Sequence, residues 1–179
     1  MEMPRLICLL AFVALQTVAS PGAELPSLDP RLEVFRPLLE KTWRGPFKDS
    51  KPDKATVDIC RWERALNGKA IRILHSINDG VYGGETLMTW DEKKQQITYH
   101  YFTTAGFMTV GTVTVDREKF TTHETVTGNK EGITEVRGAN ELLPGGGFHV
   151  KSEYLKNGQW APGHEVTYTE DPAAKVVFR

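Results

Sequence analysis

About ten short segments of alternating hydrophobicity follow one another from Thr42 to the C-terminus, and no helical crossover separates them. Turn residues bound these segments. Asn67-Gly68 is the strongest turn signal, because both central residues of a type I′ hairpin turn need a positive φ. A meander of antiparallel strands must hide its two edges, and closing into a barrel does so. We therefore expect an all-β, antiparallel up-and-down β-barrel of about ten strands, with a two-sheet sandwich as the alternative.

One short helix is expected before the strands, over residues 30–40. Asp29 is suited to its N-cap and Pro30 to its first position, while Pro37 can interrupt it. Its apolar residues fall at helical spacing: Leu32, Phe35, Leu38 and Leu39. This pattern predicts an N-terminal helix that packs its apolar face against one end of the barrel.

Length and charge narrow the class of protein. The chain has 179 residues, the size of one ordinary domain, with 22 Lys and Arg against 23 Asp and Glu. The formal net charge of -1 argues against a surface dedicated to nucleic acid or to anionic membranes. We divide the chain into a signal peptide at residues 1–20, a flexible lead at 21–29 and a single barrel domain at 30–179. A small molecule is the expected partner, and the oligomeric state stays open.

The N-terminus has the pattern of a secretory signal. Arg5 precedes an apolar run from Leu6 to Leu15, and Val18-Ala19-Ser20 supplies small residues for cleavage, which we expect after a residue between 19 and 23. The run is shorter than the ~20 residues that a membrane span needs. We expect an exported protein, periplasmic or extracellular, without an integral membrane span after cleavage; an uncleaved anchor is the alternative.

The cysteines agree with export without a disulfide. Cys8 lies inside the apolar run and would be removed with it, which leaves Cys60 alone. Cys60 lies in a strand pattern, where a small core residue is the expected role and a nucleophile the alternative.

The predicted strand faces are mixed rather than cleanly polar and apolar. Pairing across the predicted turns places Cys60 opposite His75, for example, and groups aromatic residues with a few polar ones on one face. A barrel of this strand number has room inside for one small ligand, which explains such a face. Close packing of the same side chains as core is the alternative. The candidate ligand-binding residues are Trp62, Arg64, His75, Met88, Tyr99, Tyr101 and Phe107.

Three stretches carry a family resemblance: TWRGPF from Thr42, WERALNGKAIRILHS, and GGETLMTWDEKKQQITYHYFTTAGFMTVG. They resemble secreted calycin-like barrels of the lipocalin and fatty-acid-binding type, and most closely an uncharacterised family of exported domains of unknown function. The resemblance runs from about Leu32 to the C-terminus. It implies binding of a small apolar or amphipathic molecule, with Trp43 plugging the closed end. Lys41 stands where lipocalins have a glycine, which favours a calycin-like barrel over a true lipocalin.

Motifs for catalysis are mostly absent from the sequence. There is no G-x-S-x-G elbow, and neither His123-Glu124 nor His164-Glu165 is followed by the second histidine of H-E-x-x-H. The five histidines are spread singly, so no metal site is predicted. We expect a non-catalytic binding protein without a cofactor; an enzyme acting on a molecule bound in the lumen is one alternative.

Two residues suggest more specific chemistry. Arg64, if it faces the lumen beside Trp62 and His75, could hold a ligand carboxylate; otherwise it pairs with an acidic neighbour such as Glu124. His164 lies late in the chain, as does the iron ligand of haem-binding, calycin-like barrels of the nitrobindin type. Resemblance to those proteins implies haem as an alternative cofactor, with Trp160 and Tyr168 as walls for the macrocycle.

Overall fold

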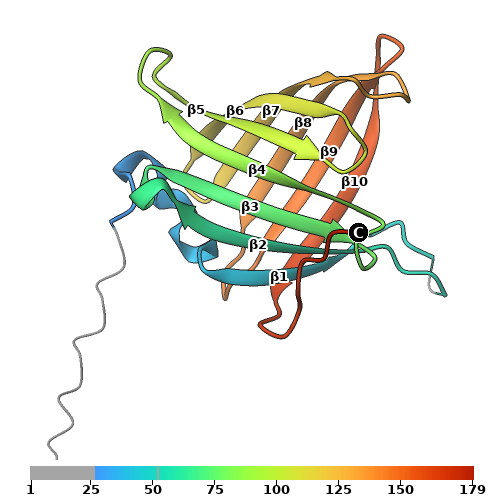
Figure 1. Cartoon of the computed structure of the whole chain (residues 1–179), viewed down its shortest axis with the longest axis horizontal. Helices are drawn as coiled ribbons and strands as arrows, with labels where there is room; N and C mark the ends of the chain where they lie inside the picture. The colour runs from blue at the N-terminus through green and yellow to red at the C-terminus, as the bar shows by residue number, and fades with distance from the viewer. Residues whose placement is uncertain (1–26, 52) are drawn as a thin grey trace, which may run out of the picture.

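The computed structural model describes residues 27–51 and 53–179, which form a closed antiparallel barrel (Figure 1). Each strand pairs with the next along the chain, and β1 pairs with β10 to close the barrel. The predicted up-and-down barrel is therefore confirmed. The strands are β1 (Lys41–Pro46), β2 (Val57–Ala65), β3 (Ala70–Ile77), β4 (Tyr82–Asp91), β5 (Gln96–Thr103), β6 (Met108–Asp116), β7 (Lys119–Thr127), β8 (Ile133–Leu142), β9 (Phe148–Lys156) and β10 (Gln159–Glu170).

Strand register agrees with the predicted pairings. Cys60 lies opposite His75, and Met88 lies opposite Tyr99. The turn at Asn67-Gly68 is longer than a two-residue hairpin, because pairing ends at Ala65 and Ala70 and the loop contains a short 3-10 turn, η2 (Leu66–Gly68). Asn67 and Gly68 both have a positive φ, as the Asn-Gly signal requires.

The N-terminal helix closes one end of the barrel. It is a 3-10 helix, η1 (Pro30–Leu38), which lies where β2 ends and β3 begins (Figure 1). Phe35 is fully buried and packs its ring on Trp62 at 5.9 Å and edge-on to Phe120 at 5.3 Å. The indole nitrogen of Trp43 donates a hydrogen bond to the carbonyl oxygen of Leu38 at 3.1 Å. Helix η1 and Trp43 together plug this end, so the lumen opens at the other.

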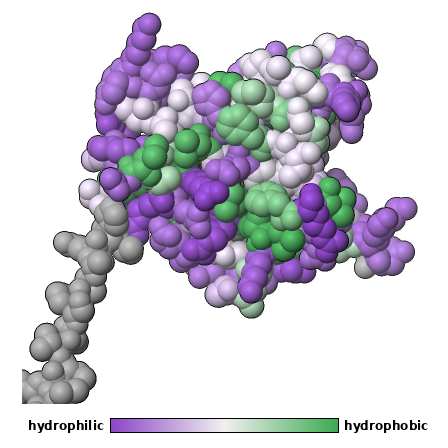
Figure 2. Space-filling model, in the orientation of Figure 1, coloured by the Kyte–Doolittle hydropathy of each residue, from purple (hydrophilic) through white to green (hydrophobic). Residues whose placement is uncertain are grey.

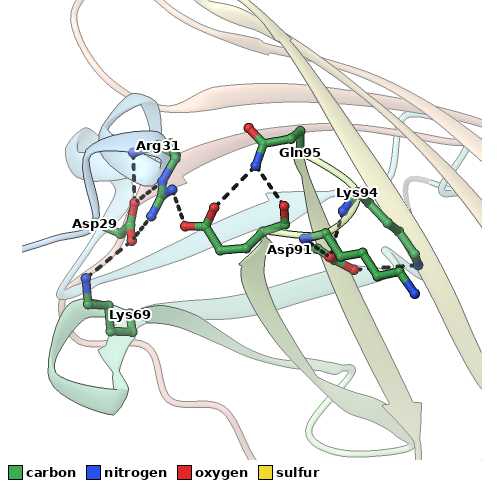
Figure 3. A network of polar contacts seen from close by, with 8 residues as sticks. Asp29, Arg31, Lys69, Asp91, Lys94 and Gln95 are labelled. Carbon is green, nitrogen blue, oxygen red and sulfur yellow. Dashed lines mark hydrogen bonds and ion pairs between the residues drawn. The ribbon is translucent and has the colours of Figure 1, made fainter.

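Asp29 anchors the start of η1, as predicted for the N-cap. Its buried carboxylate accepts hydrogen bonds from the backbone N–H of Arg31 at 3.1 Å and from the Arg31 guanidinium at 2.8 and 2.9 Å. Arg31 also pairs with Glu92 after β4, and Lys69 approaches Asp29 from η2 (Figure 3). These bonds hold the pKa of Asp29 well below its ordinary value. Of the predicted lead, Leu28 and Asp29 are buried against the barrel.

The last residues of the chain lie on the outside of the barrel. The C-terminal segment crosses the outer face of β3, where the backbone N–H of Val177 donates to the Ser76 hydroxyl at 3.0 Å (Figure 1). Hydrophilic residues cover much of the visible face, and apolar residues form separate patches (Figure 2).

Among the described residues, no helix is long and apolar enough to span a membrane. The predicted signal peptide lies outside the described residues.

Candidate functional site

Two adjoining cavities lie inside the barrel. The outer cavity, toward the open end, has a volume of about 360 Å³, and the inner cavity, toward the η1 plug, about 240 Å³. Six of the described residues line both cavities, and we call them the polar belt. They are Asp58, His75, Tyr101, Glu124, His164 and Tyr168.

The walls on either side of the polar belt are mainly apolar. The outer cavity adds Phe47, Ile77, Tyr82, Phe107, Thr109, Val126, Asn129, Glu131, Ile133, Val136 and Tyr154. The inner cavity adds Cys60, Trp62, Ile73, Thr86, Tyr99, Phe148 and Val150. The lumen is thus amphipathic, with two carboxyl groups and two histidines at mid-height and most of its apolar surface above and below them.

One half of the polar belt is a continuous hydrogen-bond chain centred on Asp58. The Tyr168 hydroxyl donates to Asp58 Oδ2 at 2.6 Å, and His75 Nδ1 lies 3.0 Å from Asp58 Oδ1. His75 Nε2 lies 2.7 Å from the Tyr101 hydroxyl, which is 2.6 Å from the Tyr82 hydroxyl. With Nδ1 donating to Asp58, a neutral imidazole accepts from Tyr101, and Tyr101 accepts from Tyr82. Every group in the chain is then satisfied.

Inward-facing glycines allow tyrosines to cross the strand beside them. Gly45 on β1 lies between Tyr168 and Asp58, and a Cβ there would come within 2.8 Å of the Tyr168 ring. Gly84 on β4 pairs with Thr103 beside Tyr101, and a Cβ there would lie 2.3 Å from the Tyr101 ring. Without side chains at these two positions, both phenols can lie across an intervening strand and reach the Asp58 chain.

Burial keeps the phenols of this chain protonated. It raises the pKa of Tyr82 to about 12 and also raises those of Tyr101 and Tyr168 above the ordinary value of a phenol. The order carboxylate, imidazole, hydroxyl in Asp58, His75 and Tyr101 resembles a catalytic triad. A phenol with a raised pKa, however, serves as a hydrogen-bond donor or a proton relay and is a poor nucleophile.

The second half of the polar belt contains Glu124 on β7. Thr109 Oγ1 donates to Glu124 Oε2 at 2.6 Å, and the nearby Tyr99 hydroxyl also favours the ionised form of this carboxyl group. Burial raises the pKa of Glu124, since only these neutral hydroxyls compensate its charge from inside the lumen. Neither cavity, as lined by the described residues, contains a lysine or an arginine.

The ionised carboxylate of Glu124 should therefore destabilise the folded protein. Glu124→Gln is accordingly expected to raise the melting temperature at neutral pH. The folded pKa lies above the unfolded value of 4.5, so the folded chain binds more protons and ionisation becomes unfavourable as pH rises. Each pKa unit corresponds to about 1.4 kcal/mol. The stability that Glu124→Gln gains over the parent protein should vanish below pH 4.5 and grow above it. Thermal unfolding of both proteins at a series of pH values would measure this difference. A variant less stable than the parent at neutral pH would contradict this.

His164 completes the polar belt because β10 is irregular. The β9–β10 register shifts between Pro162 and Glu165, and this bulge turns His164 inward. Its Nδ1 lies 2.5 Å from the Tyr154 hydroxyl, and its ring stacks on Phe47 at 5.2 Å. Burial lowers the pKa of His164, so the imidazole is neutral at neutral pH. Nε2 has no hydrogen-bond partner among residues 27–51 and 53–179.

The structure brings together most of the predicted ligand-binding residues. His75 and Tyr101 lie in the polar belt, Trp62 and Tyr99 in the inner wall, and Phe107 in the outer wall. Two others lie outside the lining of both cavities. Met88 belongs to the packed core, and Arg64 lies toward the plugged end with its Nε 3.2 Å from Glu40 Oε1.

The remaining sequence predictions concern the walls of a haem site, the role of Cys60 and metal binding. Tyr168 lines the lumen, but Trp160 is on the outside with the guanidinium of Arg137 over its ring at 4.3 Å, so it cannot form a wall. Cys60 is buried and its pKa is raised by burial. Within the described part of the chain, no three His, Cys, Asp or Glu side chains are grouped to hold a metal ion.

Sequence reasoning missed Asp58 and Tyr82, and it named Glu124 only as a partner for Arg64. Asp58 had a usable signal, because it lies two residues before Cys60 and therefore on the same inward face. Glu124 had a weaker signal, because Phe120 and Val126 share its face of the strand while the opposite face is entirely polar.

Comparison with known proteins supports the fold. No family model matches the chain, and no curated protein matches its sequence. The crystal structure of Rv2717c from M. tuberculosis is similar, with a TM-score of 0.56 and 13% sequence identity over 83% of this chain and 100% of that one. At this identity the likeness supports the fold alone, a closed antiparallel β-barrel, and no family is assigned.

Proposed function

We propose that this protein is an exported, non-catalytic binding protein whose lumen holds a small amphipathic molecule. The observation that carries the proposal is the pair of adjoining cavities that share the polar belt. A ligand would place its polar group at the belt and its apolar parts against the walls above and below.

Energetics favour a binding lumen over a simple core. Burying polar groups costs free energy that hydrogen bonds only partly recover, so a barrel needing only stability would be filled with apolar side chains. Here the lumen holds Asp58, Glu124 and two histidines around open volume. The outer cavity also falls in the range of about 300–1,000 Å³ found for small-molecule sites.

A blocking substitution tests whether the lumen binds. Val126 lines the outer cavity, whereas its neighbour Thr125 is exposed on the outer face of β7. We expect Val126→Trp to fill the outer cavity and to reduce binding of a neutral, polarity-sensitive dye such as Nile red by roughly tenfold or more, the effect of about 1.4 kcal/mol.

Thr125→Trp is the matched control, since it adds the same ring outside the barrel. Fluorescence titration of both variants should show dye affinity lost only in Val126→Trp. Equal affinities in both variants would place dye binding elsewhere and would count against the lumen. Native mass spectrometry of protein purified from its own host would then identify a retained molecule.

Haem is a second candidate, favoured by His164. A neutral imidazole held at Nδ1 by Tyr154, with Nε2 available, suits an iron ligand. The apolar walls suit a macrocycle, which would supply the redox or gas-binding chemistry. A Soret band on adding haemin that is lost in His164→Ala would support haem; no band in the parent protein would remove it.

An enzyme is a third candidate, favoured by the Asp58, His75 and Tyr101 chain. If a retained molecule is identified, its conversion by the parent protein and loss of conversion in His75→Gln would support catalysis. An unchanged molecule after prolonged incubation would leave binding as the function.

Export is proposed from the N-terminal pattern. N-terminal sequencing of the secreted or periplasmic protein should find a mature terminus between Ser20 and Glu24. Recovery of an intact Met1 in the cytosol would contradict export.

A further inference from the structure

The charges around the lumen restrict the kind of ligand. In the described part of the chain, three carboxyl groups line the outer cavity, those of Asp58, Glu124 and Glu131, and two of them also line the inner one. The basic residues lining either cavity, among the described residues, are the two histidines His75 and His164. Burial lowers the pKa of His164, so it brings no positive charge at neutral pH. The lumen is therefore an acidic environment.

Asp58 and Glu124 differ in how well they are already satisfied. Asp58 has one oxygen bonded to His75 and the other to Tyr168, and its side chain is 7% exposed. Glu124 has only hydroxyl partners, and its carboxylate can accept about four hydrogen bonds. It is partly exposed toward the cavity. Glu124 is thus the carboxyl group with capacity for a ligand.

We propose, on the basis of the lumen-binding function above, that the ligand is an amphipathic amine whose protonated nitrogen binds Glu124. An ammonium group would bring a positive charge into a lumen whose described lining contains no lysine or arginine, and it would donate charge-assisted hydrogen bonds to the carboxylate. The rings of Tyr82, Tyr101 and Phe107 line the same cavity and provide aromatic faces that attract cations. The apolar part of the ligand would contact the walls.

The same geometry disfavours fatty acids. A ligand carboxylate would enter a lumen with three carboxyl groups and no lysine or arginine in its described lining. The cation predicted for that role, Arg64, lies outside the lining and bonds Glu40. Like charges in a partly desolvated site repel, and an unpaired buried carboxylate is costly.

A matched series of probes tests the proposal: octylamine, octanol and octanoate, which share one tail and differ in the polar group. Each is titrated at neutral pH by displacement of Nile red. We expect octylamine to bind roughly tenfold tighter than octanol, the effect of one charge-assisted hydrogen bond, and octanoate to bind weakest.

Glu124→Gln should remove the preference for octylamine, because it should weaken octylamine binding much more than octanol binding. Glu135→Gln is the matched control, because Glu135 lies on the outer face and bonds His123; it should keep the preference. Octanol or octanoate binding as tightly as octylamine in the parent protein would overturn the amine proposal but leave lumen binding standing. An amine preference that survives Glu124→Gln would also overturn it. If no probe displaces the dye, the amine proposal also fails, and the comparison of Val126→Trp with Thr125→Trp alone decides whether the lumen binds.

Discussion

Replacing Phe35 with alanine is expected to lower the free energy of unfolding by about 3–5 kcal/mol, the usual cost of removing a buried aromatic ring. Phe35 is 0% exposed and contacts Trp62 and Phe120, which come from opposite sides of the barrel wall. Its ring thus joins η1 to two distant strands. Urea denaturation followed by tryptophan fluorescence would measure the loss, because Trp62 itself reports on this contact.

Val34→Ala is the control for this substitution. Val34 lies on the same helix but is only partly buried, so its truncation should cost much less than that of Phe35. Similar small losses in both variants would mean that η1 rests on the barrel without plugging it. The inner cavity would then be open to solvent at both ends, and the proposed binding site would need revision.

The first half of the barrel could be predicted in detail because its strands are regular. Between β2 and β7 no register shift occurs, so alternation along the chain identifies the inward face and turn residues identify the partners. The predicted partner of Cys60 followed from this regularity. The helix was also predictable, because Asp29 and Pro30 mark its start and three apolar residues its buried face.

The second half could not be predicted in the same way. Register shifts interrupt β8 and β10, and the shift before Glu165 decides that His164 faces inward. No turn residue or change in periodicity marks that bulge beyond Pro162-Gly163. Contacts across the closed barrel are equally hidden, as Tyr168 and Asp58 are 110 residues apart when they form their hydrogen bond.

The position of Arg64 shows why the alternation of side chains along a strand does not by itself define a site. Alternation places it on the same face as Trp62, yet it lies near the end of β2, where the plug begins. Depth along the barrel axis, and not only the face, decides whether a side chain reaches the cavity. The helix that supplies the plug also brings Glu40 beside Arg64, so the charge that could have held an acidic ligand is used in the fold.

The polar belt contains groups with opposite effects on stability. Glu124 lacks a basic partner in the described lumen, and its burial should destabilise the fold, as its raised pKa indicates. Asp58 instead satisfies two donors and should stabilise it. A residue that costs stability and faces open volume is typical of a functional position, whereas a satisfied network holds a site in shape.

Asp58→Ala is therefore expected to destabilise the protein by about 2–5 kcal/mol, because it leaves His75 Nδ1 and the Tyr168 hydroxyl without their acceptor. Asp58→Asn should cost less, since its amide oxygen can still accept one of the two hydrogen bonds. Chemical denaturation of the three proteins would rank them as parent, then asparagine, then alanine in decreasing stability.

Tyr168→Phe tests one of the two hydrogen bonds of Asp58 without removing the other. It removes one donor and keeps the ring that stacks on Phe148 at 4.5 Å, so on its own it should cost about 1–3 kcal/mol. The double variant Asp58→Ala/Tyr168→Phe should lose less stability than the sum of the losses in the two single variants, because each substitution removes the same bond. Strict additivity would show that Asp58 and Tyr168 do not interact in solution. If Asp58→Ala proves neutral, the polar belt is not held by this chain of hydrogen bonds, and the fixed geometry assumed for the ligand site is lost with it.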